Sequence, residues 1–336
     1  MKAIGYYHAG PIERADALVE TELPDPVPAG RDLLVRVEAV SVNPVDVKLR
    51  AHQAPADGQL RVLGFDAVGV VAATGPEATL FKPGERVFYA GSIRRPGSNA
   101  ELQLVDERIV GPAPTGLSAA EAAALPLTAL TAWEMLFDRL EVRRPVRGGG
   151  NAILIIGGAG GVGSIAIQLA KKLAGLSVIA TASRPETRDW VTSLGADAVV
   201  DHSKPLAAEV KKLGVAPGFV FSTTETEAHF DEIVELIAPQ GRFGVISGIG
   251  KADANKLSGK SVALCFELMF TRPTFETPDM IEQHNILAEV SRLVGIGTLR
   301  TTLGENLGRI SAENLKRAHA LVESGRARGK IVLEGW

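Results

Sequence analysis

The sequence predicts an α/β protein in which a doubly wound parallel sheet is inserted into a β-rich region. Strand-like segments separated by Pro and Gly turns fill the first ~125 residues. From residue 151 onward, short apolar strands alternate with helical segments, and mixed structure returns after residue 264. The length of 336 residues agrees with more than one domain, because a domain takes roughly 150 residues.

The first region is expected to be mostly β-strand and to end in two helices. The expected strands are 32–40, 67–73 and 86–89. Ser118 and Glu121 have the spacing of a capping box, which predicts that an alanine-rich helix begins there. A second helical stretch is expected from about Thr128 to Leu140.

The middle of the chain is read as repeated strand and helix units. The expected pairs are 151–156 with 161–174, 177–181 with 185–194, 198–200 with 205–213 and 218–221 with 227–237, before a last strand at 241–246. Strands that are apolar throughout and alternate with helices indicate a parallel sheet covered on both faces. Beyond it we expect a helix capped at Thr277 and running to about Val294, another from near Ser311, and a final strand at 330–333.

The composition excludes several classes of function. With 46% hydrophobic and 22% charged residues the chain is globular, and its net charge of −3 gives no footprint for nucleic acid or an acidic membrane. One cysteine excludes an intrachain disulfide framework and a zinc site built from several thiolates. The uncharged stretch 152–170 contains five glycines and is not read as a membrane span, and the N-terminus has no apolar core of signal-peptide length. We therefore expect a cytoplasmic protein.

The glycine-rich segment after the strand ending at Ile156 predicts a dinucleotide site. Gly158, Gly160 and Gly163 match the G-x-G-x-x-G pattern between a strand and a helix. In the expected geometry the first glycine makes the tight turn, the second admits the pyrophosphate and the third lets helix and strand pack closely. The helix N-terminus would face the phosphates. The expected loop contacts are Gly158, Ala159, Gly160, Gly161 and Val162.

The end of the second strand of this unit favours NADPH. An acidic residue there would hold the ribose 2′-hydroxyl of NAD, but the chain has Ser183 and Arg184, with Arg188 one helical turn further. A hydroxyl and forked guanidinium donors suit a 2′-phosphate. A solvated surface arginine is the alternative interpretation.

The turns after later strands should gather at the same edge of the sheet as the glycine loop, because the strands are parallel. This places His202, Ser222 and Ser247 near the cofactor. For His202, a capping or surface role is the competing interpretation.

Several motifs give the chain a family resemblance. They are VNPVD at 42–46, LGFDAVGVV at 63–71, KPGERV at 82–87, GSNAE at 97–101, GGAGGVG at 157–163, MFTR at 269–272 and GKIVL at 329–333. The chain resembles the medium-chain dehydrogenase/reductase superfamily, its quinone oxidoreductase branch, and within that a subgroup often called zinc-type alcohol dehydrogenase-like. The resemblance implies a GroES-like catalytic domain at 1–125, a Rossmann NADPH-binding domain at 126–265 and a tail at 266–336 that returns to the catalytic domain.

The positions of metal ligands in zinc-dependent relatives are filled by other residue types here. The resemblance places a cysteine ligand at Asn43, a histidine ligand at Phe65 and a further ligand within 125–128, where no Cys, His, Asp or Glu occurs. The stretch 90–110, where a structural zinc lobe would lie, has no cysteine. A catalytic zinc needs about three protein ligands. The sequence therefore predicts no metal site.

The resemblance then implies hydride transfer from NADPH to a small-molecule quinone or α,β-unsaturated carbonyl without catalytic zinc, in a homodimer. It places Asn43 and Thr128 at the nicotinamide end and makes Phe270 and Lys330 cofactor contacts. Tyr89 is a candidate hydrogen-bond donor to the acceptor oxygen, with simple strand packing as its alternative. Two alternative functions are a zinc-type alcohol or aldehyde dehydrogenase and an NADPH-binding sensor with little turnover.

Overall fold

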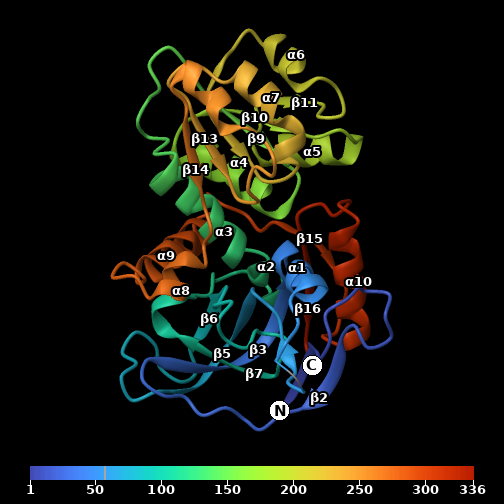
Figure 1. Cartoon of the computed structure of the whole chain (residues 1–336). Helices are drawn as coiled ribbons and strands as arrows, with labels where there is room; N and C mark the ends of the chain where they lie inside the picture. Colours follow the sequence, from blue (N-terminus) through green and yellow to red (C-terminus); the bar gives the residue numbers. More distant parts are fainter. Residues whose placement is uncertain (57) are drawn as a thin grey trace. The chain divides into compact units, whose positions relative to one another are not determined.

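The structure is a computed structural model that describes residues 1–56 and 58–336 (Figure 1). The chain forms two compact units. Unit 1 comprises Met1–Leu127 and Phe270–Trp336, and unit 2 comprises Thr128–Met269. The sequence places the corresponding divisions after residues 125 and 265. Among the described residues, no helix has the length and hydrophobicity needed to cross a membrane.

Unit 1 is built on β-sheets. Its strands are β1 (Lys2–Tyr6), β2 (Val19–Glu22), β3 (Asp32–Val42), β4 (Arg61–Val62), β5 (Ala67–Thr74), β6 (Arg86–Tyr89), β7 (Leu102–Asp106), β8 (Val110–Pro112), β15 (Leu303–Asn306) and β16 (Lys330–Glu334). Within the described residues the larger sheet has the order β15-β16-β3-β5-β6-β8, with β7 also paired to β3, and the smaller has the order β2-β1-β4. The three predicted early strands and the final strand are confirmed, and β3 extends to Val42.

One strand pairing in unit 1 joins the two ends of the chain. The last strand, β16, runs antiparallel to β3, so that Ile331 lies opposite Val42. Lys330 precedes Ile331 and Asn43 follows Val42, so this antiparallel pairing brings Lys330 and Asn43 together. The tail returns to the first region, as the resemblance implies.

The helices of unit 1 follow local sequence signals with one exception. They are α1 (Pro44–His52), α2 (Ala119–Ala123), α8 (Thr271–Phe275), α9 (Glu282–Gly295) and α10 (Ala312–Glu323), with a 3-10 turn at Glu107–Ile109. The predicted capping box at Ser118 is confirmed, and Ser311 caps α10. The expected helix start at Thr277 is wrong, because a turn precedes α9: Met280 donates to the Thr277 carbonyl, and Arg272 holds the Asp279 carboxylate at 3.0 Å.

Unit 2 is the predicted doubly wound sheet. Its elements are β9 (Gly150–Ile156), α4 (Gly161–Leu173), β10 (Ser177–Thr181), α5 (Pro185–Leu194), β11 (Ala198–Val200), α6 (Leu206–Lys211), β12 (Pro217–Ser222), α7 (Thr226–Leu236), β13 (Arg242–Val245), a 3-10 segment at Ala254–Lys260 and β14 (Ala263–Phe266). Within residues 128–269, all described, the strand order is β11-β10-β9-β12-β13-β14, and every pairing is parallel. This is the order of a Rossmann fold, with the reversal between β9 and β12.

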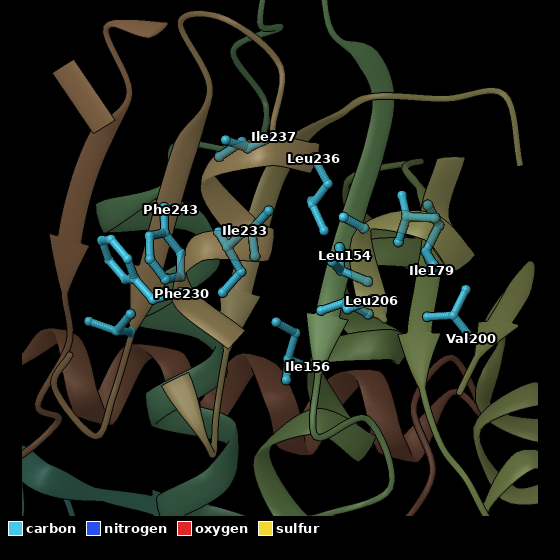
Figure 2. Close-up of a cluster of buried hydrophobic side chains, with 14 of the residues drawn as sticks. Leu154, Ile156, Ile179, Val200, Leu206, Phe230, Ile233, Leu236, Ile237 and Phe243 are labelled. Atoms are coloured by element: carbon cyan, nitrogen blue, oxygen red, sulfur yellow. The ribbon is translucent and has the colours of Figure 1, made fainter. Parts of the chain in front are cut away.

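Apolar side chains on alternate positions of the strands form the core of unit 2. Leu154 and Ile156 of β9 pack with Ile179 of β10 and with Phe230 and Ile233 of α7 on one face of the sheet (Figure 2). The opposite face packs against α4, where Trp190 of α5 also donates a 2.8 Å hydrogen bond to the Ser164 hydroxyl. Helices therefore cover both faces, which is why the strands are apolar throughout.

The second of the two helices predicted at the end of the first region begins earlier than expected and ends irregularly. It comprises α3 (Pro126–Trp133) and a π-helical segment at Glu134–Arg139. The start of α3 is fixed in unit 1, where the Leu127 N–H donates 2.7 Å to a carboxylate oxygen of Asp66.

Candidate functional site

The glycine loop joins β9 to α4 in a tight turn. Gly157 adopts φ +80°, a left-handed conformation that favours glycine. The prediction that Gly158 makes this turn is therefore wrong by one residue. Gly160 is the N-cap of α4 with φ −73°, so the helix begins at Gly161 directly after the loop.

The other glycines of the loop serve two different purposes. A Cβ on Gly163 would lie 2.7 Å from the Gly158 Cα, and a Cβ on Gly158 would lie 2.9 Å from the Ala180 Cβ. These two positions therefore allow the close packing of helix and strand. A Cβ on Gly160 would meet nothing nearer than the Gly157 carbonyl oxygen at 3.4 Å. Internal packing does not explain the glycine at position 160, where the backbone has space for a ligand to approach.

The chain offers a fixed anion site at this loop. The first N–H groups of α4 have no intrahelical acceptor, and they lie at the positive end of the helix dipole. The expected loop residues Gly158, Ala159, Gly160, Gly161 and Val162 all lie in the loop or in the first turn of α4. The residues present fit the pyrophosphate of a dinucleotide.

The strand order reverses beside the glycine loop, where a ligand crevice is expected in this fold. Thr223, after β12, donates from its hydroxyl to the Ile156 carbonyl at 2.8 Å and so ties the two strand ends together. The Ser222 hydroxyl lies 2.9 Å from the Thr226 hydroxyl and 3.2 Å from the Thr224 carbonyl, so its hydrogen bonds are local. Ser247 is exposed in the turn after β13.

The two arginines expected at the cofactor ribose have different surroundings. Arg184 precedes α5, is partly exposed and forms an ion pair with Glu186, with Nε 2.9 Å from a carboxylate oxygen. Arg188 donates from its two terminal nitrogens to the carbonyls of Ala182 and Val199, each at 3.2 Å. Ser183 lies half-buried between β10 and Arg184.

His202 lies in the turn that follows β11. Partial desolvation lowers the pKa of His202, and the charges of His229 and Arg184 lower it further, although Asp201 opposes them. An anionic ligand bound beside His202 would raise the same pKa.

Unit 1 contains a buried polar cluster that joins the start of the chain to its end. It consists of Asn43, Asp46, Asp66 and Lys330, each at most 3% exposed. The Lys330 ammonium lies 3.0 Å from an Asp66 carboxylate oxygen and 3.1 Å from the Val42 carbonyl, and it also donates to the Asn43 side-chain oxygen. Sequence reasoning named Asn43 and Lys330 separately but did not bring them together.

Hydrogen bonds hold both carboxylates of this cluster. Asp66 accepts from the Asn43 amide nitrogen and from the Leu127 N–H, each at 2.7 Å. Asp46 accepts from the Asn43 N–H at 2.8 Å and the Gly64 N–H at 2.9 Å. Burial raises the pKa of Asp66 and raises that of Asp46 to about 7, while the Lys330 charge opposes both shifts.

The remaining predicted site residues belong to two environments. Tyr89 in β6 is 1% exposed, its hydroxyl has no hydrogen-bond partner among the described residues, and burial raises its pKa. Phe65 and Phe270 pack edge to face in unit 1, with ring centroids 5.3 Å apart. Thr128 is buried in α3, at the first position of unit 2.

Family comparisons agree with both units. The model of the alcohol dehydrogenase GroES-like domain matches residues 29–130, and the model of the zinc-binding dehydrogenase matches residues 161–295. The chain belongs to the medium-chain dehydrogenase/reductase superfamily. This confirms the family resemblance and the fold class, and it makes the chain an oxidoreductase by family.

Individual relatives carry different functional names. A zinc-type alcohol dehydrogenase-like protein of Staphylococcus aureus is 44% identical over 99% of both chains. A quinone oxidoreductase of Pseudomonas aeruginosa is 31% identical over 91% of this chain and 92% of its own. A Rhizobium etli structure, provisionally named a zinc-dependent alcohol dehydrogenase, is 61% identical with a TM-score of 0.98, covering 100% and 98%. A mycobacterial structure complexed with NADPH is 27% identical with a TM-score of 0.83, covering all of both chains.

Two of these relatives are named for zinc, but the side chains of this superfamily member do not suit a zinc site. Among the described residues, no three His, Cys, Asp or Glu side chains are grouped so that they could hold a metal ion. Phe65 supplies an aromatic ring where the zinc-dependent pattern has a histidine, and the Asn43 side chain is already bonded to Lys330 and Asp66. A catalytic zinc site needs about three nitrogen, sulfur or carboxylate ligands, which this donor set does not provide.

Proposed function

We propose that the chain is an NADPH-dependent reductase that delivers hydride to a quinone or an α,β-unsaturated carbonyl without catalytic zinc. The donor set around Asn43 carries this proposal. The Lys330 ammonium, the Asn43 amide and the Asp66 carboxylate are bonded to each other there, the Asp46 carboxylate accepts from backbone N–H groups beside them, and Phe65 stands where a ligand histidine would be required. Alcohol oxidation in this superfamily would need a Lewis acid to stabilise the alkoxide.

The cofactor half of the proposal rests on unit 2. The loop around Gly160 and the N-terminus of α4 suit the pyrophosphate, and Ser183 and Arg184 follow β10 where a ribose-binding carboxylate would select NAD. The carboxylate of Glu186 is paired with Arg184, and a 2′-phosphate would compete for the same guanidinium. The NADPH of the mycobacterial relative supports this choice.

The acceptor half of the proposal follows from the absence of a fitting metal site and from one hydroxyl. NADPH, when bound, supplies a hydride from its nicotinamide ring. A quinone or enone spreads the arriving negative charge onto an oxygen, which needs only a hydrogen-bond donor. Tyr89 has a buried hydroxyl without a partner among the described residues, and we assign it that role. The quinone oxidoreductase of P. aeruginosa supports this substrate class.

The proposal is tested by NADPH oxidation with a panel of quinones, enones and aldehydes, and by NADP⁺ reduction with a panel of alcohols. We expect turnover with quinones or enones that persists after dialysis against a chelator. If the protein holds one zinc ion per chain, and activity is lost when a chelator removes the zinc and returns when zinc is added back, the zinc-type dehydrogenase would be established instead. Tight NADPH binding without turnover on any acceptor would favour the sensor. The expected homodimer and cytoplasmic location remain predictions, and sedimentation would test the first.

A further inference from the structure

The buried cluster around Lys330 contains two carboxyl groups and one ammonium group. Asp46 and Asp66 are two carboxylates, 1% and 0% exposed, and the Lys330 ammonium lies 3.0 Å from an Asp66 oxygen. The carbonyl of Val42 and the side-chain oxygen of Asn43 complete a set of oxygen atoms around the ammonium. Oxygen sets of this kind, with carboxylates and carbonyls, are those that hard metal ions bind.

The Lys330 ammonium has no donor left for an outside ligand. An ammonium carries three N–H groups. Three acceptors surround it: the carbonyl of Val42, the side-chain oxygen of Asn43 and the carboxylate of Asp66. The expected contact between Lys330 and the cofactor would have to displace one of them.

The same ammonium determines the orientation of the Asn43 amide. Lysine can only donate and a carboxylate can only accept, so the amide oxygen must face Lys330 and the amide nitrogen must face Asp66. The nitrogen does donate to Asp66 at 2.7 Å and to the Ser41 carbonyl at 3.3 Å. Both of its N–H groups are occupied, which leaves Asn43 only its oxygen to offer a ligand.

The cluster also connects to the start of α3. The Asp66 oxygen that does not face Lys330 accepts from the Leu127 N–H, one residue before Thr128. Loss of the Lys330 charge would therefore also disturb the hydrogen bond between Asp66 and the first turn of α3. The segments that contain Asn43, Asp66 and Leu127 are thus linked to the Lys330 ammonium, the last of them through Asp66.

We propose that Lys330 is the resident cation of this cluster and a positioning residue for Asn43 and Asp66, taking the place that a metal ion would take in such an oxygen set. Because Lys330 is part of β16, its ammonium group cannot dissociate from the cluster as a bound ion could. The inference does not rest on the proposed reaction, because it concerns the protein without cofactor or substrate.

The experiment is chemical rescue of Lys330→Ala, measured as the thermal unfolding temperature of the protein without cofactor. Removing one partner of a buried ion pair should lower Tm by roughly 10 °C. We expect methylammonium or ethylammonium chloride to restore a large part of this loss, because each can place an ammonium in the vacated space. Tetramethylammonium chloride at equal ionic strength, which has no N–H group, should restore nothing.

The control is Lys82→Ala, which removes an exposed lysine. Its Tm should be that of the parent and should respond equally to the three salts. Equal responses of Lys330→Ala to the three salts would overturn the proposal, as would uptake of one zinc ion per chain by the parent protein, measured by elemental analysis.

A second comparison keeps the proposal testable if Lys330→Ala does not fold. The double variant Lys330→Met with Asp66→Asn removes the cation and its paired charge together. We expect it to be more stable than Lys330→Met alone, because no uncompensated carboxylate at position 66 is left buried. A double variant that is less stable than Lys330→Met would contradict the resident-cation role.

Discussion

Arg188 donates a 3.2 Å hydrogen bond to the carbonyl oxygen of Val199, across the ends of two neighbouring strands. Its other terminal nitrogen donates to Ala182 at the same distance, so the side chain links the ends of β10 and β11. Arg184, four residues earlier, is held by Glu186 at the surface. The two arginines predicted for the same phosphate are therefore in different positions to reach it.

This difference predicts separate effects for two alanine variants. Arg184→Ala should lower the preference for NADPH over NADH by about 10- to 150-fold, because a charge-assisted hydrogen bond to phosphate contributes about 1.5–3 kcal/mol. Arg188→Ala should instead destabilise the fold by about 1–3 kcal/mol, because two carbonyls lose their partner. Binding titrations with both cofactors and urea unfolding measure the two effects. An unchanged NADPH to NADH ratio in Arg184→Ala would remove the 2′-phosphate assignment.

The glycine loop predicts a second pair of variants with opposite effects. Gly163→Ala should destabilise the protein without cofactor by about 1–3 kcal/mol, because its Cβ would overlap the Gly158 backbone. Gly160→Ala should leave that stability nearly unchanged, because its φ of −73° suits alanine and its Cβ has space. It should nevertheless weaken NADPH binding about tenfold or more, or about 1.4 kcal/mol. Equal NADPH affinity in Gly160→Ala and the parent would show that the pyrophosphate does not approach this backbone.

Tyr89→Phe tests the proposed donor to the acceptor oxygen. The hydroxyl is buried without a partner among the described residues, so its removal should leave the free energy of unfolding unchanged or raise it. If the hydroxyl stabilises the developing oxyanion, kcat/KM for quinone reduction should fall about 10²-fold. Tyr7→Phe, which alters an exposed tyrosine, is the matched control and should leave both quantities unchanged. Full activity in Tyr89→Phe would leave Tyr89 with the strand-packing role alone.

The secondary-structure elements that the sequence predicts correctly are those with local signals. The bounds of β10 and α5 agree with the prediction at both ends, because a β-branched strand and a Pro at the first helical position are read within a few residues. The sequence does not predict the edge strand β14, because its four residues show no alternation of polar and apolar side chains. The glycine turn was placed one residue late, because the motif fixes the spacing of glycines and not which of them takes a positive φ.

The buried cluster lay beyond local reading because its members are far apart in the chain. Lys330 and Asn43 are 287 positions apart, and only the pairing of β16 with β3 brings them together. One signal was available: a lysine opens the apolar run of the last strand, and a buried lysine needs an acidic partner. Nothing in the sequence selects Asp66 as that partner among the 39 acidic residues of the chain.

His319 predicts a pH dependence of stability that involves neither the cofactor nor the cluster. Its ring in α10 is fully buried, and neither ring nitrogen has a hydrogen-bond partner in the part of the chain that the structure describes. Desolvation, and secondarily the charge of Arg50, lowers its pKa to about 3. The folded protein therefore keeps His319 neutral, while the unfolded chain binds a proton below about pH 6.5. Stability should fall as the pH falls from about 6.5 towards 3.

The size of this effect can be measured with His319→Leu. At pH 5 the unfolded state gains about 2 kcal/mol from protonating this one histidine, given its ordinary pKa of about 6.5. His319→Leu should therefore lose about 2 kcal/mol less stability than the parent between pH 8 and pH 5 in urea unfolding. His8→Gln, which alters an exposed histidine, should keep the parent's pH dependence. If the His319→Leu variant loses as much stability as the parent over this interval, then the buried ring is not the source of the acid sensitivity.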